Sequence, residues 1–428
     1  MGFKKVLAYL IIIILGFSYE EDNYTEITQS LIQWGVKNKI NFSNVNLGPS
    51  NVDIPNYYPA TKISFTAARN MKKDEKILKI PTTLNISIPS ILPLLTKKLK
   101  EAWELLKVSS NPLFQSSLLK ELAFLSLCIE RALEKEKGNF YKKYKPYLKS
   151  IEKLSFIHTF PLLFSERELS FFQFTIFGRD VLSNKKYIFD EENYIKNDLK
   201  INPISENYLK YRVLTESKTQ YLDDTSTLVP FLDFFLHRPP SYSNAYFYIE
   251  DGYIVVKALK DINEKGIIVI ETKEISNSMN FLYYGYTVDK SSVYGPSVLS
   301  IFHRAYIKKT QDIINWNRDK EYVDISKDDC IEKLKVHFRR LLGDDKPITE
   351  VVQSIVDNLI YSIWDYKSIN LLDLERNLLF PPNIENLKKV FDDEQRLLTI
   401  RINYFDGKYD IKTDGYSLDS IKYINTDL

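Results

Sequence analysis

The stretch from residue 245 to residue 286 constrains the fold more than any other part of the sequence. Asp251-Gly252 stands between two runs of strand-forming composition, AYFYIE and YIVVKAL. An Asp-Gly pair in this position is typical of a two-residue β-hairpin turn. Gly266 then turns the chain into a third apolar run, IIVIET, and SMNFLYYG follows with helix-like composition. We therefore predict a hairpin, a further strand and a short helix, in this order.

The upstream half of the chain combines strands with longer helices. Apolar spacing predicts a short amphipathic helix around Leu31, then a strand over residues 63–67 and a return strand over residues 77–80, joined by a charged turn. Asn111-Pro112 predicts the N-cap and first residue of a longer helix. The apolar face of that helix consists of Leu118, Leu122, Leu125 and Ile129.

After about residue 300 the pattern returns to helices. Amphipathic segments over residues 326–342, 352–363 and 387–398 each place apolar side chains at helical spacing. Strands divided by a helical block, and then followed by a helical tail, indicate the α+β class rather than a parallel-sheet enzyme.

Composition and missing motifs exclude several function classes. A formal net charge of +2 over 428 residues argues against a nucleic-acid-binding surface, which needs a clustered basic excess. The sequence contains no phosphate-binding P-loop, no GxGxxG and no GxSxG nucleophile elbow. The histidines lack the spacing of a metal site, so we expect no metal. They are His158, His237, His303 and His337.

The first residues have the order of a secretory signal peptide. Lys4 and Lys5 precede an apolar run from Val6 to Phe17, and small residues follow. The run is about 12 residues, or roughly 18 Å as a helix, which is short for a bilayer core. We predict a signal over residues 1–18, no stable membrane span after its cleavage, and a location in the ER lumen or outside the cell.

The same N-terminal run is also compatible with an uncleaved anchor, a buried helix or a mispredicted start, and these alternatives stay open. The protein is cytoplasmic if the signal is misread. The two cysteines, Cys128 and Cys330, form no disulfide framework and do not decide the compartment.

Three segments in order resemble the SET-domain methyltransferases. They cover residues 67–87, residues 122–169 with the sequence PYL at 146–148, and residues 228–286. The chain is similar to the branch typified by the Rubisco large-subunit lysine methyltransferase and the actin-histidine methyltransferase. The segment at 67–87 looks like the first hairpin of the SET core, and PYL looks like a turn after an insert helix.

The resemblance implies a particular domain organisation. A SET domain would cover residues 25–295, with its β-rich core split into halves over about 55–90 and 225–295. A helical insert would occupy about 91–224, and an all-helical, substrate-binding-like domain would cover 296–428. We expect a monomer.

The same resemblance implies S-adenosyl-L-methionine as cofactor and names residues that would contact it. Asp233, Leu236 and His237 match the family's Asp-x-x-Asn-His, whose backbone reads the adenine and whose Asn helps hold the amino-acid end of the cofactor. Leu236 replaces that Asn. Lys218 stands near a family Arg that contacts the cofactor carboxylate. Asn277 and Tyr284 match family positions, and the family's glycine-containing approach is Ile63-Ser64-Phe65-Thr66 here.

The family's catalytic tyrosine has no counterpart at its expected position. Counting forward from Gly266 gives Lys273, and counting back from Asn277 gives Thr272. A threonine hydroxyl has less reach than the phenol, and a lysine cation would repel the sulfonium of the cofactor.

Several of these residues also have purely structural interpretations. His237 would satisfy carbonyl groups at a helix end, Asn277 would cap a helix, and Tyr284 with Tyr286 would pack between a strand and a helix.

Two functions follow from the resemblance, and a third does not need it. The first is a protein-lysine (or histidine) N-methyltransferase with a degraded active site, acting on a protein substrate. The second is a catalytically inactive SET scaffold that binds a protein partner. The third is an unrelated secreted binding module.

Overall fold

The protein has an α+β fold, as predicted, and divides into two compact units. Unit 1 comprises Met1–Ile157 and Lys186–Glu274, and unit 2 comprises His158–Lys185 and Ile275–Leu428. The computed structural model describes residues 25–49, 62–155, 157–173, 175–201, 207–272, 275–288 and 381–406, with short pieces between residues 298 and 359. The predicted domain borders near residues 91, 225 and 296 stay predictions.

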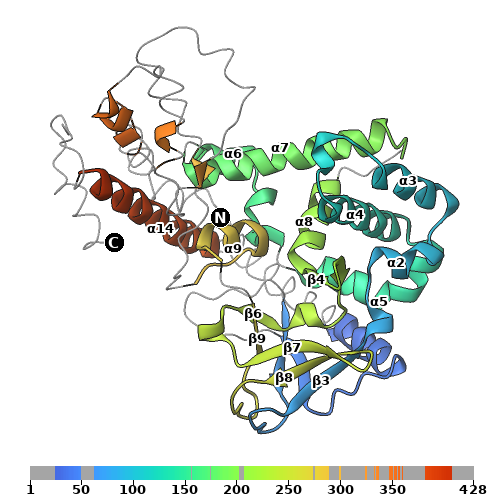
Figure 1. Cartoon of the computed structure of the whole chain (residues 1–428). Helices are drawn as coiled ribbons and strands as arrows, with labels where there is room; N and C mark the ends of the chain where they lie inside the picture. Colours follow the sequence, from blue (N-terminus) through green and yellow to red (C-terminus); the bar gives the residue numbers. More distant parts are fainter. Residues whose placement is uncertain are drawn as a thin grey trace, which may run out of the picture. The chain divides into compact units, whose positions relative to one another are not determined.

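Unit 1 contains a five-stranded sheet (Figure 1). Its order is β3 (Lys76–Pro81), β8 (Tyr253–Ala258), β7 (Ala245–Glu250), β9 (Val269–Glu271) and β6 (Leu236–Arg238). β3, β8 and β7 pair antiparallel, and β9 is parallel to β7 and β6. The predicted hairpin is confirmed: Asp251 and Gly252 join β7 to β8 with φ of 51° and 77°, the left-handed backbone that this turn requires.

Two further pairs of strands lie in unit 1, and one predicted pairing is wrong. β1 (Val45–Pro49) pairs with β2 (Ile63–Ala67), and β4 (Thr219–Leu222) pairs with β5 (Thr225–Leu228). The segments over 63–67 and 77–80 are strands, but they do not form a hairpin, because β3 pairs with β8 instead.

Long-range hydrogen bonds explain why that hairpin does not form. The amide of Ala67 donates to the carbonyl of Gly266 at 2.8 Å, and the amide of Met71 donates to that of Ile262 at 2.8 Å. The charged turn is held by the same distant region, since Lys257 and Asp74 form an ion pair at 2.9 Å. The chain after β2 is therefore committed to residues 257–266 rather than to its own return strand.

The helical part of unit 1 begins with a helix over residues 25–37. Its other helices are α2 (Ile88–Ile91), α3 (Lys97–Lys107), α4 (Ser117–Lys135), α5 (Gly138–Leu154), most of α7 (Ile176–Asn197) and α8 (Tyr208–Lys218). Single 3₁₀ turns are η1 (Thr82–Leu84), η2 (Leu92–Leu94), η3 (Pro112–Phe114), η6 (Leu232–Phe234) and η7 (Pro240–Tyr242).

The predicted start of the long helix is wrong by one short turn. The Asn111 side chain does cap, accepting from the amide of Leu113 at 2.9 Å, but it caps η3. Helix α4 begins at Ser117, and its N-cap is Ser116. Leu118 is 39% exposed, whereas the other three predicted apolar positions are buried as expected. Because both Asn111 and Ser116 are good capping residues, the local pattern does not distinguish them.

Unit 2 is built mainly from helices. It contains η5 (Pro161–Leu163), α6 (Glu166–Ser170), the first turns of α7, α9 (Asn277–Tyr284) and α14 (Pro381–Asp406), with a two-residue strand pair of β10 (Val298–Leu299) and β11 (Val323–Asp324) and the turn η4 (Ile157–Thr159) at its border. Phe177 stacks on Phe281 with ring centroids 5.5 Å apart. Gly285, with φ of 71°, ends α9.

The predicted tail helix at 387–398 is confirmed as part of α14. Helical residues occur within 352–363, while most of that segment, most of 326–342 and Cys330 lie outside the described residues. The predicted signal at 1–18 also lies outside them. Among the helices that the structure describes, none combines the length and the hydropathy needed to cross a membrane.

Candidate functional site

The segment from Phe231 to Arg238 is the part of unit 1 to which the family resemblance assigns cofactor contacts. It begins with Phe231 in the left-handed backbone region, at φ 74°, where a bulky residue is strained by about 1–3 kcal/mol. Packing holds it there: the ring of Phe231 is fully buried and stacks on Trp34 at 5.8 Å. A Cβ at Gly35 would lie 2.6 Å from the same ring, so only glycine allows this approach.

Asp233 is buried in the turn η6 and has two polar neighbours. Its carboxylate accepts a hydrogen bond from the hydroxyl of Tyr147 on α5. The ammonium of Lys218, at the end of α8, is also buried and attracts the carboxylate electrostatically. Burial raises the pKa of Asp233 to about 6, while Lys218 and Tyr147 oppose that rise. Burial lowers the pKa of Lys218.

His237 lies in β6 with its ring directed back to the same turn. Its Nε2 atom is 3.0 Å from the carbonyl oxygen of Leu232. Desolvation lowers the pKa of His237 to about 4, and the charges of Lys218 and Arg238 act in the same direction. The imidazole is therefore neutral at pH 7, and Nε2 carries the proton that it donates. This is the structural role that the sequence left open for His237.

Leu236 stands where the family has an asparagine, and its neighbours are apolar too. Leu236 is 4% exposed and packs with Val269 and Ile267. The approach strand is similar: Phe65 in β2 is fully buried, and its ring centroid lies 4.4 Å from that of Phe235. Side chains that would line a polar cofactor site therefore contribute to the core of unit 1.

Of the two candidates for the catalytic position, Thr272 and Lys273, the structure describes only Thr272. Thr272 follows β9, and its amide donates to the carbonyl of Arg238 at 2.8 Å. That bond continues the parallel pairing of β9 with β6. Lys273 lies outside the described residues.

Asn277 and Tyr284, the other two residues that match family positions, lie in unit 2. The prediction that Asn277 caps α9 is wrong, because Ser276 is the N-cap and accepts from the amide of Met279 at 3.2 Å. Asn277 is buried, and its Nδ2 donates to the carbonyl of Val288 at 3.0 Å and to Asp393 of α14 at 2.7 Å. Its Oδ1 accepts from the amide of Val288 at 2.7 Å, so the side chain is fully used within unit 2.

Tyr284 ends α9 and packs against a second tyrosine. Its ring centroid is 6.2 Å from that of Tyr286, which is 7% exposed. Tyr284 itself is half-buried, and the prediction that the two rings pack between a strand and a helix stays a prediction.

The structure thus gathers Lys218, Asp233, Leu236 and His237 in unit 1 and adds Tyr147, which sequence reasoning missed. Tyr147 is the tyrosine of the PYL sequence. The prediction of a turn there is wrong, because PYL lies inside α5. Among the described residues, no group of three or more His, Cys, Asp or Glu side chains is arranged to hold a metal ion.

Comparison with solved structures identifies the architecture. The chain matches the SET domain of LSMT bound to lysine and AdoHcy with a TM-score of 0.56 and 13% identity, covering 94% of this chain and 99% of that one. It matches Rubisco LSMT bound to AdoMet with a TM-score of 0.59 and 14% identity, covering 93% and 96%. The chain has a SET-domain fold.

A third solved structure shows the same fold at similarly low sequence identity. The SET domain of LSMT bound to MeLysine and AdoHcy matches with a TM-score of 0.60 at 14% identity, over 93% of this chain and 96% of that one. No family model matches the sequence, and a search of curated proteins by sequence finds no match either. The SET fold is therefore established by structure, and the chemistry of the site depends on this chain's own residues.

Within this SET fold the unit 1 site fits S-adenosylmethionine poorly at two places. Leu236 offers no hydrogen bond where the resemblance implies an amide, and Phe65 fills the approach strand. Asp233 and His237 are present, but each is already bonded within the protein, to Tyr147 and to Leu232. At positions 236 and 65 the described side chains are therefore apolar and buried.

The pKa values of Asp233 and His237 predict opposite effects of pH on stability. The pKa of Asp233 is raised in the fold from 3.8 to about 6, so its contribution to stability falls as pH rises from about 4 to 6. The pKa of His237 is lowered from 6.5 to about 4, so its contribution increases over the same window. Each is worth roughly 1–3 kcal/mol, and in the native protein the two largely cancel.

An Asp233→Asn variant separates the two titrations. Because only His237 remains, we expect the variant to gain about 2 kcal/mol relative to the native protein between pH 4 and 6. Urea unfolding at several pH values measures this difference. Asp198→Asn, which changes an exposed carboxylate, is the control and should show no such trend. Parallel pH profiles of Asp233→Asn and the native protein would contradict the assignment.

Proposed function

We propose that the protein is an S-adenosylmethionine-dependent protein-lysine N-methyltransferase of the SET type, with a degraded cofactor site. What carries the proposal is the SET fold itself, which matches solved SET domains over most of the chain. Those solved structures show LSMT bound to lysine and AdoHcy, and Rubisco LSMT bound to AdoMet. The presence of Asp233 and His237 beside the β6–β9 pair supports a shared site frame.

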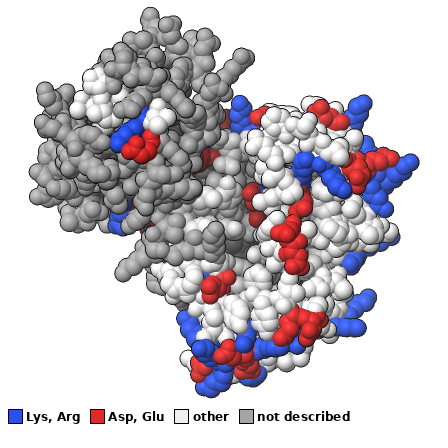
Figure 2. Space-filling model, viewed as in Figure 1, with Lys and Arg blue, Asp and Glu red and all other residues white. Residues whose placement is uncertain are grey.

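The degraded site predicts weak binding of the cofactor. A buried polar group left without its partner costs about 1–3 kcal/mol. Leu236 offers no hydrogen bond to the amino-acid end of the cofactor, so that end would carry such a cost. The substrate would be the side chain of a lysine (or histidine) on another protein. In the view of Figure 2, basic and acidic side chains are mixed on the described surface, which supports a protein partner rather than nucleic acid.

A second candidate is a catalytically inactive scaffold that binds a protein partner. The observation that favours it is the burial of Phe65 and Leu236, because core side chains occupy positions that a methyltransferase gives to cofactor contacts. In this case the SET fold would serve only to present a surface. The two candidates for the family's catalytic tyrosine position are Thr272 and Lys273. Neither is a tyrosine, which also favours the scaffold.

Labelled methyl transfer distinguishes the two candidates. The full chain is incubated with methyl-labelled S-adenosylmethionine and protein mixtures, and the products are analysed for methyl-lysine and methyl-histidine. Slow transfer is expected, with loss on Tyr284→Ala and retention in Tyr283→Ala, the neighbouring control. Partner binding without any transfer would overturn the enzyme proposal in favour of the scaffold.

We further propose that residues 1–18 direct the monomeric protein into the secretory pathway and are removed there. The charged start and short apolar run support this. N-terminal sequencing of native material tests it: cleavage near Ser18 is expected, and a retained Met1 on soluble protein would refute it. Light scattering should give the mass of one chain.

A further inference from the structure

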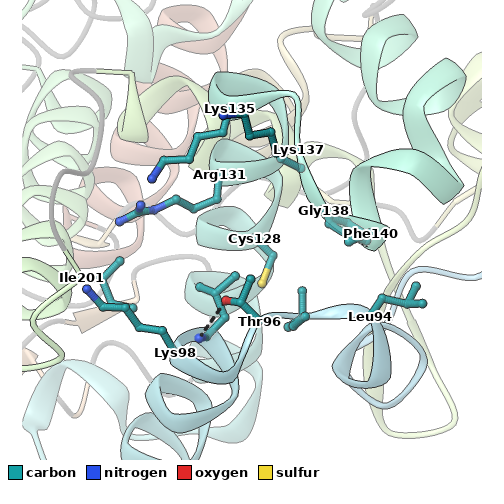
Figure 3. Close-up of a pocket in the computed structure, with 13 residues that line it drawn as sticks. Leu94, Thr96, Lys98, Cys128, Arg131, Lys135, Lys137, Gly138, Phe140 and Ile201 are labelled. Atoms are coloured by element: carbon teal, nitrogen blue, oxygen red, sulfur yellow. Dashed lines mark hydrogen bonds between the residues drawn. The ribbon is translucent and has the colours of Figure 1, made fainter.

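A cavity of about 230 Å³ lies in the helical part of unit 1, away from the segment at 231–238. Its wall is formed by α4, the start of α5, and the residues before and within α3 (Figure 3). Buried apolar side chains line it, namely Leu95, Cys128, Ala132 and Ile201. The volume lies below the roughly 300–1,000 Å³ of typical ligand sites, so a ligand for this cavity is small and partly apolar.

The charged side chains that line the cavity all have the same sign. Lys98, Arg131, Lys135 and Lys137 contribute to it, and no acidic side chain among the described residues does. Within the described part of the chain, none of the four forms an ion pair with a carboxylate. In Figure 3 the nitrogen ends of Lys98, Arg131 and Lys135 lie on one side of the view. As far as the structure describes its surroundings, the cavity therefore combines an apolar interior with a positive edge that no carboxylate pairs.

Arg131 adds a specific unmet requirement. Its Nε and Nη2 atoms are shielded from solvent and have no hydrogen-bond partner among the described residues. A buried donor without a partner costs about 1–3 kcal/mol, which makes the arrangement unfavourable unless something binds there. These two atoms form one edge of the guanidinium group, the edge that meets both oxygens of a carboxylate in a bidentate pair.

From this geometry we propose that the cavity binds a small amphipathic carboxylate. Its carboxylate is attracted by Lys98, Arg131 and Lys135, and the Arg131 side chain turns toward it so that the shielded Nε and Nη2 atoms gain the partners that they lack among the described residues. Its apolar body occupies the space beside Leu95, Cys128 and Ala132. Burial raises the pKa of the Cys128 thiol, so this side chain serves as apolar wall and not as a nucleophile. The site is independent of the proposed methyl transfer.

Calorimetric titration of the full chain with octanoate tests the proposal. We expect one saturable site, with binding at least tenfold weaker for octan-1-ol, which lacks the charge, and for inorganic phosphate, which lacks the apolar body. Equal affinity for octan-1-ol would overturn the role of the charges. Equal affinity for phosphate, or no binding of octanoate at millimolar concentration, would overturn the amphipathic ligand.

Variants locate the binding. Arg131→Gln and the cavity-filling Ala132→Phe should each weaken octanoate binding about tenfold or more. Since either change could disturb folding, Lys98→Gln on the exposed rim is compared with Lys100→Gln, a lysine on the same helix that does not line the cavity. Loss of octanoate affinity in Lys98→Gln, with unchanged affinity in Lys100→Gln, supports the site. Equal effects of the two lysine changes, or unchanged affinity in Arg131→Gln, would contradict it.

Discussion

Replacing Arg212 with alanine is expected to lower the free energy of unfolding by about 3–5 kcal/mol. Arg212 lies in the helical part of unit 1, with its side chain only 2% exposed. Its Nε is 3.1 Å from Glu191, whose side chain is fully buried, and its Nη1 is 2.8 Å from Glu216. The hydroxyl of Tyr208 also donates to Glu191, at 2.6 Å. Without the guanidinium, Glu191 would be a buried charge with no cation beside it.

Urea unfolding of Arg212→Ala against the native protein measures this effect. Lys210→Ala is the matched control, because it removes a partly exposed lysine of the same helix that pairs with Glu152 at 3.6 Å; its cost should stay below about 1 kcal/mol. The double change Arg212→Met with Glu191→Gln should recover part of the loss, since no charge is left buried. A loss for Arg212→Ala no larger than for Lys210→Ala would show that this cluster does not stabilise the fold.

The second large effect is a gain of cofactor affinity in Leu236→Asn. The substitution restores the amide that the SET resemblance implies, and one hydrogen bond to a charged group is worth about 1.5–3 kcal/mol. We expect S-adenosylmethionine to bind about tenfold or more tightly as a result. The same change removes apolar packing against Val269 and Ile267, so the variant should unfold more easily by about 1–3 kcal/mol.

Val269→Asn is the matched control for that gain. It places the same amide in the same apolar cluster from the neighbouring strand β9, and it should destabilise the protein without improving cofactor binding. Calorimetry gives the affinity, and urea unfolding gives the stability. Equal affinities of Leu236→Asn and the native protein would mean that position 236 no longer faces a cofactor site.

Local sequence signals predict the elements of the fold better than their pairing. The Asp251-Gly252 hairpin follows from two adjacent residues, and α14 follows from helical spacing of apolar residues. β3 pairs with the distant β8, and the hydrogen bonds of Ala67 and Met71 likewise reach residues almost 200 positions later. No local pattern encodes such bonds, and the nearest strand is therefore the expected partner of β2.

In the candidate site, too, residues close together in the sequence are predicted and distant partners are not. Asp233, Leu236 and His237 are found from sequence because they lie within five residues of one another and match a family motif. Tyr147, which bonds Asp233, is 86 residues away and lies inside a helix that contains a proline. Asn277 is predicted as a cap because Asn favours that position, but Ser276 occupies it, and the Asn277 side chain is used by Val288 and Asp393.

Titration of the full chain with S-adenosylmethionine in a calorimeter tests the central claim most directly. A SET site that keeps its frame but has Leu236 in place of an amide should bind the cofactor weakly, with saturation near millimolar concentration. Tight, micromolar binding would contradict the degraded site, and the absence of any heat at millimolar cofactor would contradict the enzyme itself.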